Sequence, residues 1–138
     1  MTSVSGSIDA DDGMFKGDVD HYLSVGLSAV GVIEEALAAA PEVTSIREVL
    51  DIPCGYGRVL RFLVLMFPGA RFAACEILPG AVDFCAEEFD ADAIYSVSDL
   101  DNVTFDRQFD LIWCGSLLTH LCQDDILKLF NLFSRSIS

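Results

Sequence analysis

Basic residues are scarce in this sequence. Its 138 residues include 8 lysines and arginines against 22 aspartates and glutamates, which gives a formal net charge of −14. Such an excess of negative charge repels the phosphate backbone of nucleic acids and anionic membrane surfaces. We therefore expect neither direct nucleic-acid binding nor membrane association by these residues.

Long apolar runs are also missing. No stretch approaches the ~20 consecutive apolar residues that span a bilayer. The first residues are polar and acidic, unlike the basic and then apolar start of a secretory signal. We expect a soluble, cytoplasmic chain.

Paired cysteine motifs are absent as well. The five cysteines stand at positions 54, 75, 85, 114 and 122, and no two of them have CxxC spacing. Their odd number and the apolar surroundings of four of them favour reduced thiols with structural roles. Cys122 and His120 lack third and fourth ligands at a workable spacing, so we expect no metal site.

Apolar residues make up 52% of the chain, which is enough for one packed core in a chain of single-domain length. Residues 1–12 are mostly small, polar or acidic and show no periodicity. This composition predicts a disordered tail. We expect one domain over residues 13–138.

Within that domain, two kinds of apolar spacing alternate. Helical spacing predicts helices, and short apolar runs next to Gly or Pro predict strands. The predicted helices cover residues 20–40, 59–67, 80–89 and 124–134, and the predicted strands cover residues 46–52, 71–75, 93–97 and 109–114. In the last helix, one apolar face is expected to hold Ile126, Leu127, Phe130 and Phe133. The strand at 109–114 is nearly all apolar, as in a strand covered on both faces. The alternation favours an α/β fold with a parallel sheet and right-handed crossovers.

The sharpest motif lies between the first predicted strand and the helix after it, and reads Asp51-Ile52-Pro53-Cys54-Gly55-Tyr56-Gly57. The two glycines remove side chains, so that the backbone can approach a ligand. Glu76 ends the next predicted strand about twenty residues further on, where an acid can hold a ribose diol. The spacing therefore predicts a nucleoside-binding loop.

Two features decide between nucleoside cofactors. A dinucleotide fingerprint has a third glycine three residues after Gly57, whereas this chain has Leu60 there. Asp51 would repel a pyrophosphate but suits a cationic ligand. S-adenosylmethionine carries a sulfonium and an amino group, so these residues favour it over NAD.

Three segments resemble the class I S-adenosylmethionine-dependent methyltransferases. Residues 49–58 resemble their motif I, residues 74–77 resemble their second motif, and residues 109–121 resemble their fourth strand and the loop after it. The resemblance covers residues 46–133. It implies a Rossmann-like three-layer sandwich with a mostly parallel sheet in the strand order 3-2-1-4.

The resemblance also implies a set of residues for each part of the cofactor. The methionine part would be held by the glycine loop, with Asp51, Pro53, Gly55 and Gly57, and the ribose by Glu76. The adenine would be held by Ile77 with Ser98 or Asp99. The reactive side of the cofactor would be lined by Cys114, Gly115 and Ser116, after the fourth strand. Asp101 and Asp106 compete with Asp99 for its role.

Two further residues have a functional and a structural interpretation. His120 is a candidate general base because imidazole titrates near neutral pH, although a packing role against the last helix is favoured. Tyr22 could close over the cofactor from the first helix, although a place in the core is favoured. Residues 22–26 also resemble the leading helix of methyltransferases that occur beside glycosyltransferases.

The family pattern continues past the last predicted helix with about three more strands. The sequence stops at Ser138, before these strands, so we expect it to be either a fragment or a naturally short product. The strand at 109–114 would have an open edge with unpaired backbone groups, which predicts self-association as a homo-oligomer.

The leading function is S-adenosylmethionine-dependent methyl transfer to a small-molecule or sugar-like acceptor, with this chain supplying the cofactor-binding half. The alternative is a non-catalytic module that binds S-adenosylmethionine or a partner. A third hypothesis, a nicotinamide-dependent oxidoreductase, is supported by the shared fold alone.

Overall fold

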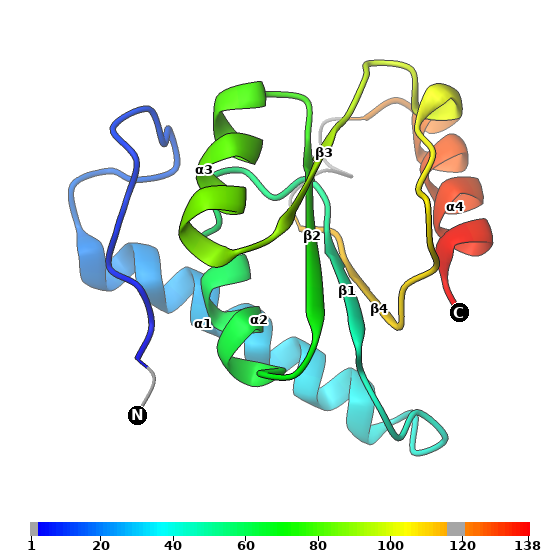
Figure 1. Cartoon of the computed structure of the whole chain (residues 1–138), viewed down its shortest axis with the longest axis horizontal. Coiled ribbons are helices and arrows are strands. Elements are labelled where there is room, and N and C mark those ends of the chain that lie inside the picture. The colour runs from blue at the N-terminus through cyan, green and yellow to red at the C-terminus, as the bar shows by residue number, and fades with distance from the viewer. Residues whose placement is uncertain (1–2, 116–120) are drawn as a thin grey trace.

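The computed structural model describes residues 3–115 and 121–138. Its centre is a parallel sheet in the order β3-β2-β1-β4, with helices on both faces (Figure 1). The strands are β1 Glu48–Asp51, β2 Arg71–Glu76, β3 Asp92–Tyr95 and β4 Leu111–Trp113. The helices are α1 Val19–Ala38, α2 Leu60–Met66, α3 Pro79–Phe89, the short 3-10 helix η1 Leu100–Asn102, and α4 Gln123–Ser136. The predicted α/β class and the strand order 3-2-1-4 are confirmed.

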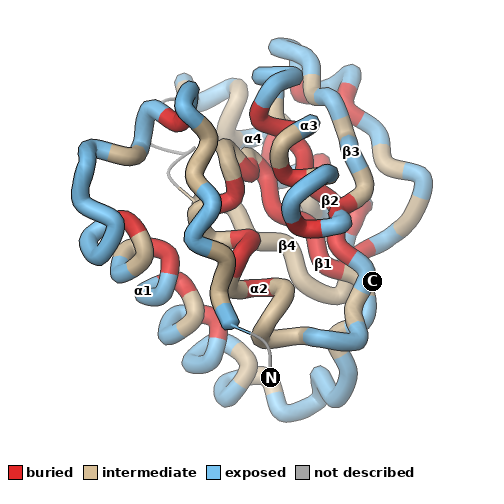
Figure 2. The backbone as a smooth tube through the Cα atoms, turned by 60° about the vertical axis from the view of Figure 1, so that its left-hand side comes forward, coloured by how far each residue is buried: buried red, intermediate tan, exposed pale blue. Residues whose placement is uncertain are grey.

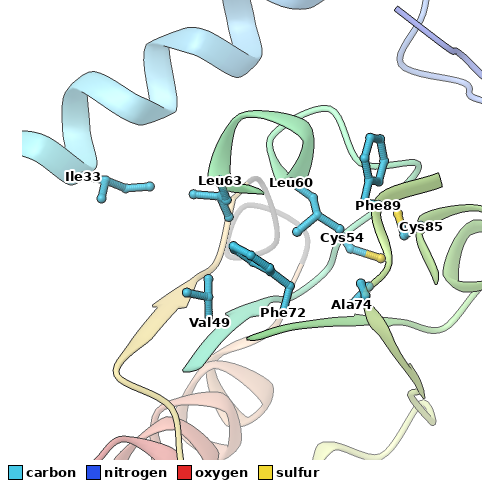
Figure 3. Close-up of a cluster of buried hydrophobic side chains, with 10 residues drawn as sticks. Ile33, Val49, Cys54, Leu60, Leu63, Phe72, Ala74, Cys85 and Phe89 are labelled. Carbon is cyan, nitrogen blue, oxygen red and sulfur yellow. The ribbon is translucent and has the colours of Figure 1, made fainter. Parts of the chain in front are cut away.

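The core consists of two apolar layers, one on each face of the sheet. Successive strand residues point to opposite faces, so Val49 and Phe72 join the layer under α1, α2 and α3 (Figure 3). Their neighbours Leu50 and Ala73 join the layer under η1 and α4. Because both faces are covered, the central strands are continuous apolar runs.

Helix α1 lies against the loop that follows β1. Its side chain at the N-cap, Asp18, accepts a hydrogen bond from the backbone N–H of His21, and its buried residues recur at helical spacing along one side (Figure 2). The closest approach is at Gly26, where a Cβ atom would lie 2.3 Å from the carbonyl oxygen of Arg58. Any larger residue at position 26 would push α1 away from this loop.

Helix α4 turns only part of the predicted face to the core. Phe133 packs against the core, and Ile126 is half-buried. Leu127 and Phe130 are 55% and 51% exposed, whereas Leu129 and Leu132 are fully buried. The helix has apolar residues on two adjacent stripes, and both satisfy helical spacing. Packing against the sheet, not the periodicity, selects the stripe with Leu129 and Leu132.

Strand β4 is shorter and less buried than predicted. It spans three residues, all of them half-buried, and among the described residues it pairs along its length only with β1. Just before it, Phe109 forms a parallel bridge with Ile137. The N–H of Phe109 donates to the carbonyl of Ser136 at 2.7 Å, and the N–H of Ser138 donates to the carbonyl of Phe109 at 2.8 Å. The start of the predicted open edge is therefore paired.

The N-terminal segment lies against the domain, although its composition predicts a disordered tail. The Arg61 guanidinium donates to the carbonyl oxygens of Ser5 and Ser7 at 2.9 and 3.0 Å, and Asp12 is buried. A buried guanidinium needs acceptors, and a polar segment can supply them.

Two further expectations concern the chain as a whole. All five cysteines are free, as predicted. None of the helices within residues 3–115 and 121–138 is both long enough and apolar enough to cross a membrane.

Candidate cofactor site

The loop after β1 has a backbone that only glycine adopts easily at two positions. Gly55 has a φ of 51° and Gly57 a φ of 80°. A Cβ at Gly57 would lie 2.4 Å from a ring carbon of Phe89. A Cβ at Gly55 would meet no atom of the described residues within 4 Å. Gly57 therefore lets the loop pack on α3, while Gly55 leaves space open in front of the loop.

That open space is a cavity of about 500 Å³ at the carboxyl ends of β1 and β4. The loop and the residues at or after the strand ends contribute Asp51, Pro53, Gly55, Arg58, Glu76, Trp113, Cys114 and Gly115 to its lining. An apolar part of the lining comes from Met14 and from Val25, Ala29 and Val32 of α1. Ligands of open parallel sheets bind at this edge.

A second, smaller cavity of about 140 Å³ lies at the carboxyl ends of β2 and β3. Ile77, Val97, Ser98 and Leu121 are among its lining residues. Pro53 and Glu76 line both cavities. The two spaces therefore adjoin at Glu76 and could hold the two ends of one elongated ligand.

Asp51 is a buried carboxyl in the lining of the first cavity. Its side chain is only 2% exposed, and among the described residues its Oδ2 has no hydrogen-bond partner. Burial, and then the nearby charge of Glu76, raise the pKa of this carboxyl well above its usual range. A cation placed in the first cavity would relieve the cost of burying the charged carboxylate.

Glu76 is held in place by backbone donors. Its Oε2 accepts from the N–H of Gly55 at 3.2 Å, and its Oε1 accepts from the N–H of Ile77 at 2.9 Å and of Leu78 at 3.4 Å. A carboxylate offers about four acceptor positions. The fixed carboxylate therefore keeps acceptor capacity for a ligand hydroxyl at the junction of the two cavities.

The structure brings together most of the residues that the sequence analysis selected. Those that line the first cavity are Asp51, Pro53, Gly55, Glu76, Cys114 and Gly115. Ile77 and Ser98 line the second cavity together with Pro53 and Glu76. Ser116 and His120 lie outside the described residues.

Three selected residues line neither cavity. Gly57 is covered by Phe89. The fully buried Tyr22 donates its hydroxyl to Asp12 at 2.6 Å; burial and this hydrogen bond raise the pKa of Tyr22. Asp99 caps η1 and pairs with Lys128 at 3.2 Å. The backbone N–H of Asp101 and then Lys128 lower the pKa of Asp99.

Other lining residues were not selected from the sequence. Arg58 directly follows the two loop glycines, so its position in the motif could have predicted that it lines the cavity. Asp12 and Met14 precede α1 in a segment without periodicity, and Val25 and Ala29 belong to the apolar pattern of α1. Periodicity cannot distinguish an apolar cavity wall from a packed core.

Comparison with known proteins adds a family assignment to this geometry. Residues 49–138 match the family described as "Methyltransferase domain". The chain belongs to this methyltransferase family. The match begins at β1 and includes the glycine loop, Glu76 and β4, whereas α1 and the N-terminal segment lie outside it.

Individual relatives of this methyltransferase domain are distant. The malonyl-[acyl-carrier protein] O-methyltransferase of Acetivibrio thermocellus is 26% identical over 66 residues, which are 47% of this chain and 23% of that protein. An S-adenosylmethionine-dependent methyltransferase structure from Clostridium acetobutylicum aligns with a TM-score of 0.62 and 21% identity, over 78% of this chain and 44% of that one.

The sugar N-methyltransferase structure from Streptoalloteichus sp aligns over the whole of this methyltransferase domain. The TM-score is 0.64, the identity is 23%, and the alignment covers 100% of this chain and 56% of that one. At these identities the structural likeness establishes the fold. The domain spans about half the length of these two solved relatives and about a quarter of the malonyl-[acyl-carrier protein] O-methyltransferase.

Proposed function

We propose that the chain binds S-adenosylmethionine across the two adjoining cavities and contributes the cofactor-binding half of a methyltransferase. One observation carries this proposal: the buried carboxyl of Asp51, without a hydrogen-bond partner on Oδ2 among the described residues, lines the first cavity beside the glycine loop. S-adenosylmethionine brings a sulfonium and an ammonium group to such a place. NAD would bring a pyrophosphate to the glycine loop, where Asp51 would repel it.

In this proposal the methionine part occupies the first cavity against Asp51, Pro53 and Gly55. The ribose hydroxyls hydrogen-bond to Glu76. The adenine fills the second cavity between Ile77 and Ser98. The lining of both cavities supports this arrangement, because Glu76 lies where they meet.

The remaining cofactor candidates take positions around these residues. Cys114 and Gly115 line the first cavity at the end of β4, so we assign them, with Ser116, to the side from which the methyl group leaves. Gly57 supports the loop by packing, and Tyr22 acts on the cavity through Asp12. Asp99 stays a weaker candidate for the adenine edge, because it is paired with Lys128.

When bound, the cofactor supplies an electrophilic methyl group for an in-line displacement at carbon. The protein then has to align the acceptor, exclude water and, for some acceptors, take a proton. The apolar wall formed by Met14, Val25 and Val32 is suited to excluding water. His120 is the proposed base, four residues after Ser116.

For the acceptor we propose a small or sugar-like molecule. The likeness to the sugar N-methyltransferase extends over the whole chain, whereas the acyl-carrier-protein methyltransferase matches 47% of it. Three carboxylates, Asp12, Asp51 and Glu76, line the first cavity and disfavour an anionic acceptor. We further propose that the chain acts in the cytoplasm, in keeping with its free cysteines.

A second candidate is a non-catalytic module that binds S-adenosylmethionine. Its support is that the described residues form both cavities by themselves. Titrations with S-adenosylmethionine, S-adenosylhomocysteine and NAD, followed by methyl transfer to sugar and amine acceptors, test both candidates. Binding of the first two ligands without NAD supports the cofactor assignment, and binding without any transfer favours the module. Binding of NAD alone would contradict both.

A further inference from the structure

Arg58 is the one cationic residue among the described residues that line the first cavity; the other charged lining residues are Asp12, Asp51 and Glu76. It directly follows Gly57 and is half-buried. Its guanidinium carbon lies 5.8 Å from the centre of the Tyr22 ring, over the ring face. Within residues 3–115 and 121–138, no hydrogen bond or ion pair engages this guanidinium. A stacked arginine of this kind is held in orientation while its five donors remain available.

The carboxylates of the cavity differ in how fully the protein satisfies them. Asp12 accepts from the Tyr22 hydroxyl on Oδ2 and from the N–H of Met14 on Oδ1. Glu76 accepts backbone N–H groups on both oxygens. Of these three carboxyls, Asp51 is the one that keeps an oxygen without a partner within residues 3–115 and 121–138. The cavity thus contains one incompletely satisfied carboxyl group, that of Asp51, and one incompletely satisfied cation, Arg58.

These two groups do not neutralise each other, because no ion pair joins them. The raised pKa of Asp51 reflects burial and Glu76, and the positive charge of Arg58 is not among its causes. Asp51 is the last residue of β1, and Arg58 follows it in the sequence, after Gly55 and Gly57 of the same loop. A ligand that satisfies both groups must carry a cationic group and an anionic group on one short skeleton.

An α-amino acid end has this charge pattern. We propose that Arg58 binds the α-carboxylate of the methionine part of S-adenosylmethionine, with the cationic groups of the ligand facing Asp51. The planar guanidinium fork matches a carboxylate with two parallel hydrogen bonds. This inference rests on the proposed function, since it names the part of that ligand which Arg58 recognises.

The test uses two ligands that differ only at the carboxylate: S-adenosylmethionine and its decarboxylated analogue, the S-adenosyl derivative of 3-(methylthio)propylamine. Wild-type protein should bind the decarboxylated ligand at least about tenfold more weakly, as expected for the loss of a charge-assisted hydrogen bond. Arg58→Gln should lose about the same factor for S-adenosylmethionine and change less than about threefold for the analogue. Arg58→Lys should recover part of the loss.

Arg47→Gln is the matched control, because Arg47 is exposed and directly precedes β1 at its amino end, away from the cavity. It removes one positive charge without touching the site and should leave both affinities unchanged. Equal loss of both ligands in Arg58→Gln would overturn the assignment and reduce Arg58 to a packing role on Tyr22. Equal binding of the two ligands by wild-type protein would also overturn it, even if Arg58→Gln failed to fold. Wild-type protein that binds neither ligand would instead contradict the proposed function itself.

Discussion

Asp51 shows, at the residue scale, a conflict between stability and binding. A buried carboxylate without a compensating donor or cation is costly, and the folded protein responds by raising the pKa of Asp51. The carboxyl pKa is about 3.9 in the unfolded chain. Between this pH and the raised native pKa, the folded protein keeps the proton of Asp51 and the unfolded chain has released it. Stability falls as the pH rises from the unfolded pKa towards the raised native pKa.

Asp51→Asn should remove this pH-dependent loss. We expect the ligand-free variant to be more stable than wild type near pH 7, with the difference shrinking towards pH 4. The same variant should bind S-adenosylmethionine more weakly, because the cation loses its partner. Urea unfolding from pH 4 to pH 8, with and without ligand, measures both effects. A variant that is less stable at pH 7 and binds normally would refute this account of Asp51.

The two loop glycines should respond differently to the same substitution. In Gly57→Ala the new Cβ would meet the Phe89 ring at a left-handed φ, so we expect a loss of roughly 2 kcal/mol or more. In Gly55→Ala the backbone strain is similar in kind but the new Cβ projects into open space, so we expect a loss of roughly 1–2 kcal/mol with a larger effect on ligand affinity. Thermal unfolding and ligand titration of both variants give the comparison. The reverse pattern would show that Gly55 is the packing glycine.

At the scale of elements, Arg61 joins three parts of the chain. Its guanidinium is fully buried and donates to the carbonyls of Gly57 and Ser5, each at 2.9 Å, and to the Tyr22 hydroxyl at 3.3 Å. It also lies over the Tyr22 and Phe89 rings, at 5.1 and 5.3 Å from their centres. The N-terminal segment, α1 and the glycine loop therefore share one cation.

Arg61→Met should break this connection while keeping an apolar side chain of similar length. We expect a loss of about 3 kcal/mol in the free energy of unfolding, and rapid proteolysis within residues 3–15 of the still-folded protein. The exposed Arg47→Met serves as the control. Urea denaturation and limited proteolysis followed by mass spectrometry provide the readouts. Unchanged cleavage of the N-terminal segment would contradict the role given to Arg61.

Much of the element order could be predicted from the sequence. Short apolar runs predicted the four strands and helical spacing predicted the four α-helices, because the central strands are covered on both faces. The short helix η1 was not predicted. The face of α4 was predicted only in part. Phe133 packs against the core, but the exposed Leu127 and Phe130 satisfy the same spacing as the buried Leu129 and Leu132. The contacts of residues 3–12 depend on a long-range partner, Arg61, which local composition cannot reveal.

The site was predictable to the extent that it follows one motif. Asp51, Gly55 and Glu76 lie at strand ends, where the parallel topology brings them together. The contribution of Asp12, Met14 and α1 to the cavity arises from tertiary packing outside the family match. Gly57 was selected for the cofactor, but it packs against Phe89 of α3. The glycine pattern alone does not distinguish a packing glycine from one that gives a ligand access.

On the scale of the whole molecule, apolar surface and an incompletely paired strand lie close together. Leu127 and Phe130 of α4 and Ile137 beyond it are exposed, and Ile137 pairs with Phe109 just before β4. Along Leu111–Trp113, β1 is the one pairing partner among the described residues. Such an edge favours pairing with a second chain.

We therefore predict self-association of the 15.0 kDa chain. Light scattering coupled to size exclusion should show an average mass that rises with concentration, and Phe130→Lys should lower it by placing a charge in the apolar patch. Ser24→Lys, at an exposed position of α1 on the opposite face of the sheet, controls for added charge alone. A constant monomer mass up to high protein concentration would rule this prediction out.

The central claim is that S-adenosylmethionine binds where the two cavities meet at Glu76. Calorimetric titration of S-adenosylmethionine into wild-type protein, Glu76→Ala and the exposed control Glu87→Ala tests it most directly. We predict one site per chain in wild type and Glu87→Ala, and an affinity lower by at least about tenfold in Glu76→Ala, because the ribose loses a charge-assisted hydrogen bond. Absence of binding to wild type, or an unchanged affinity in Glu76→Ala, would contradict the account.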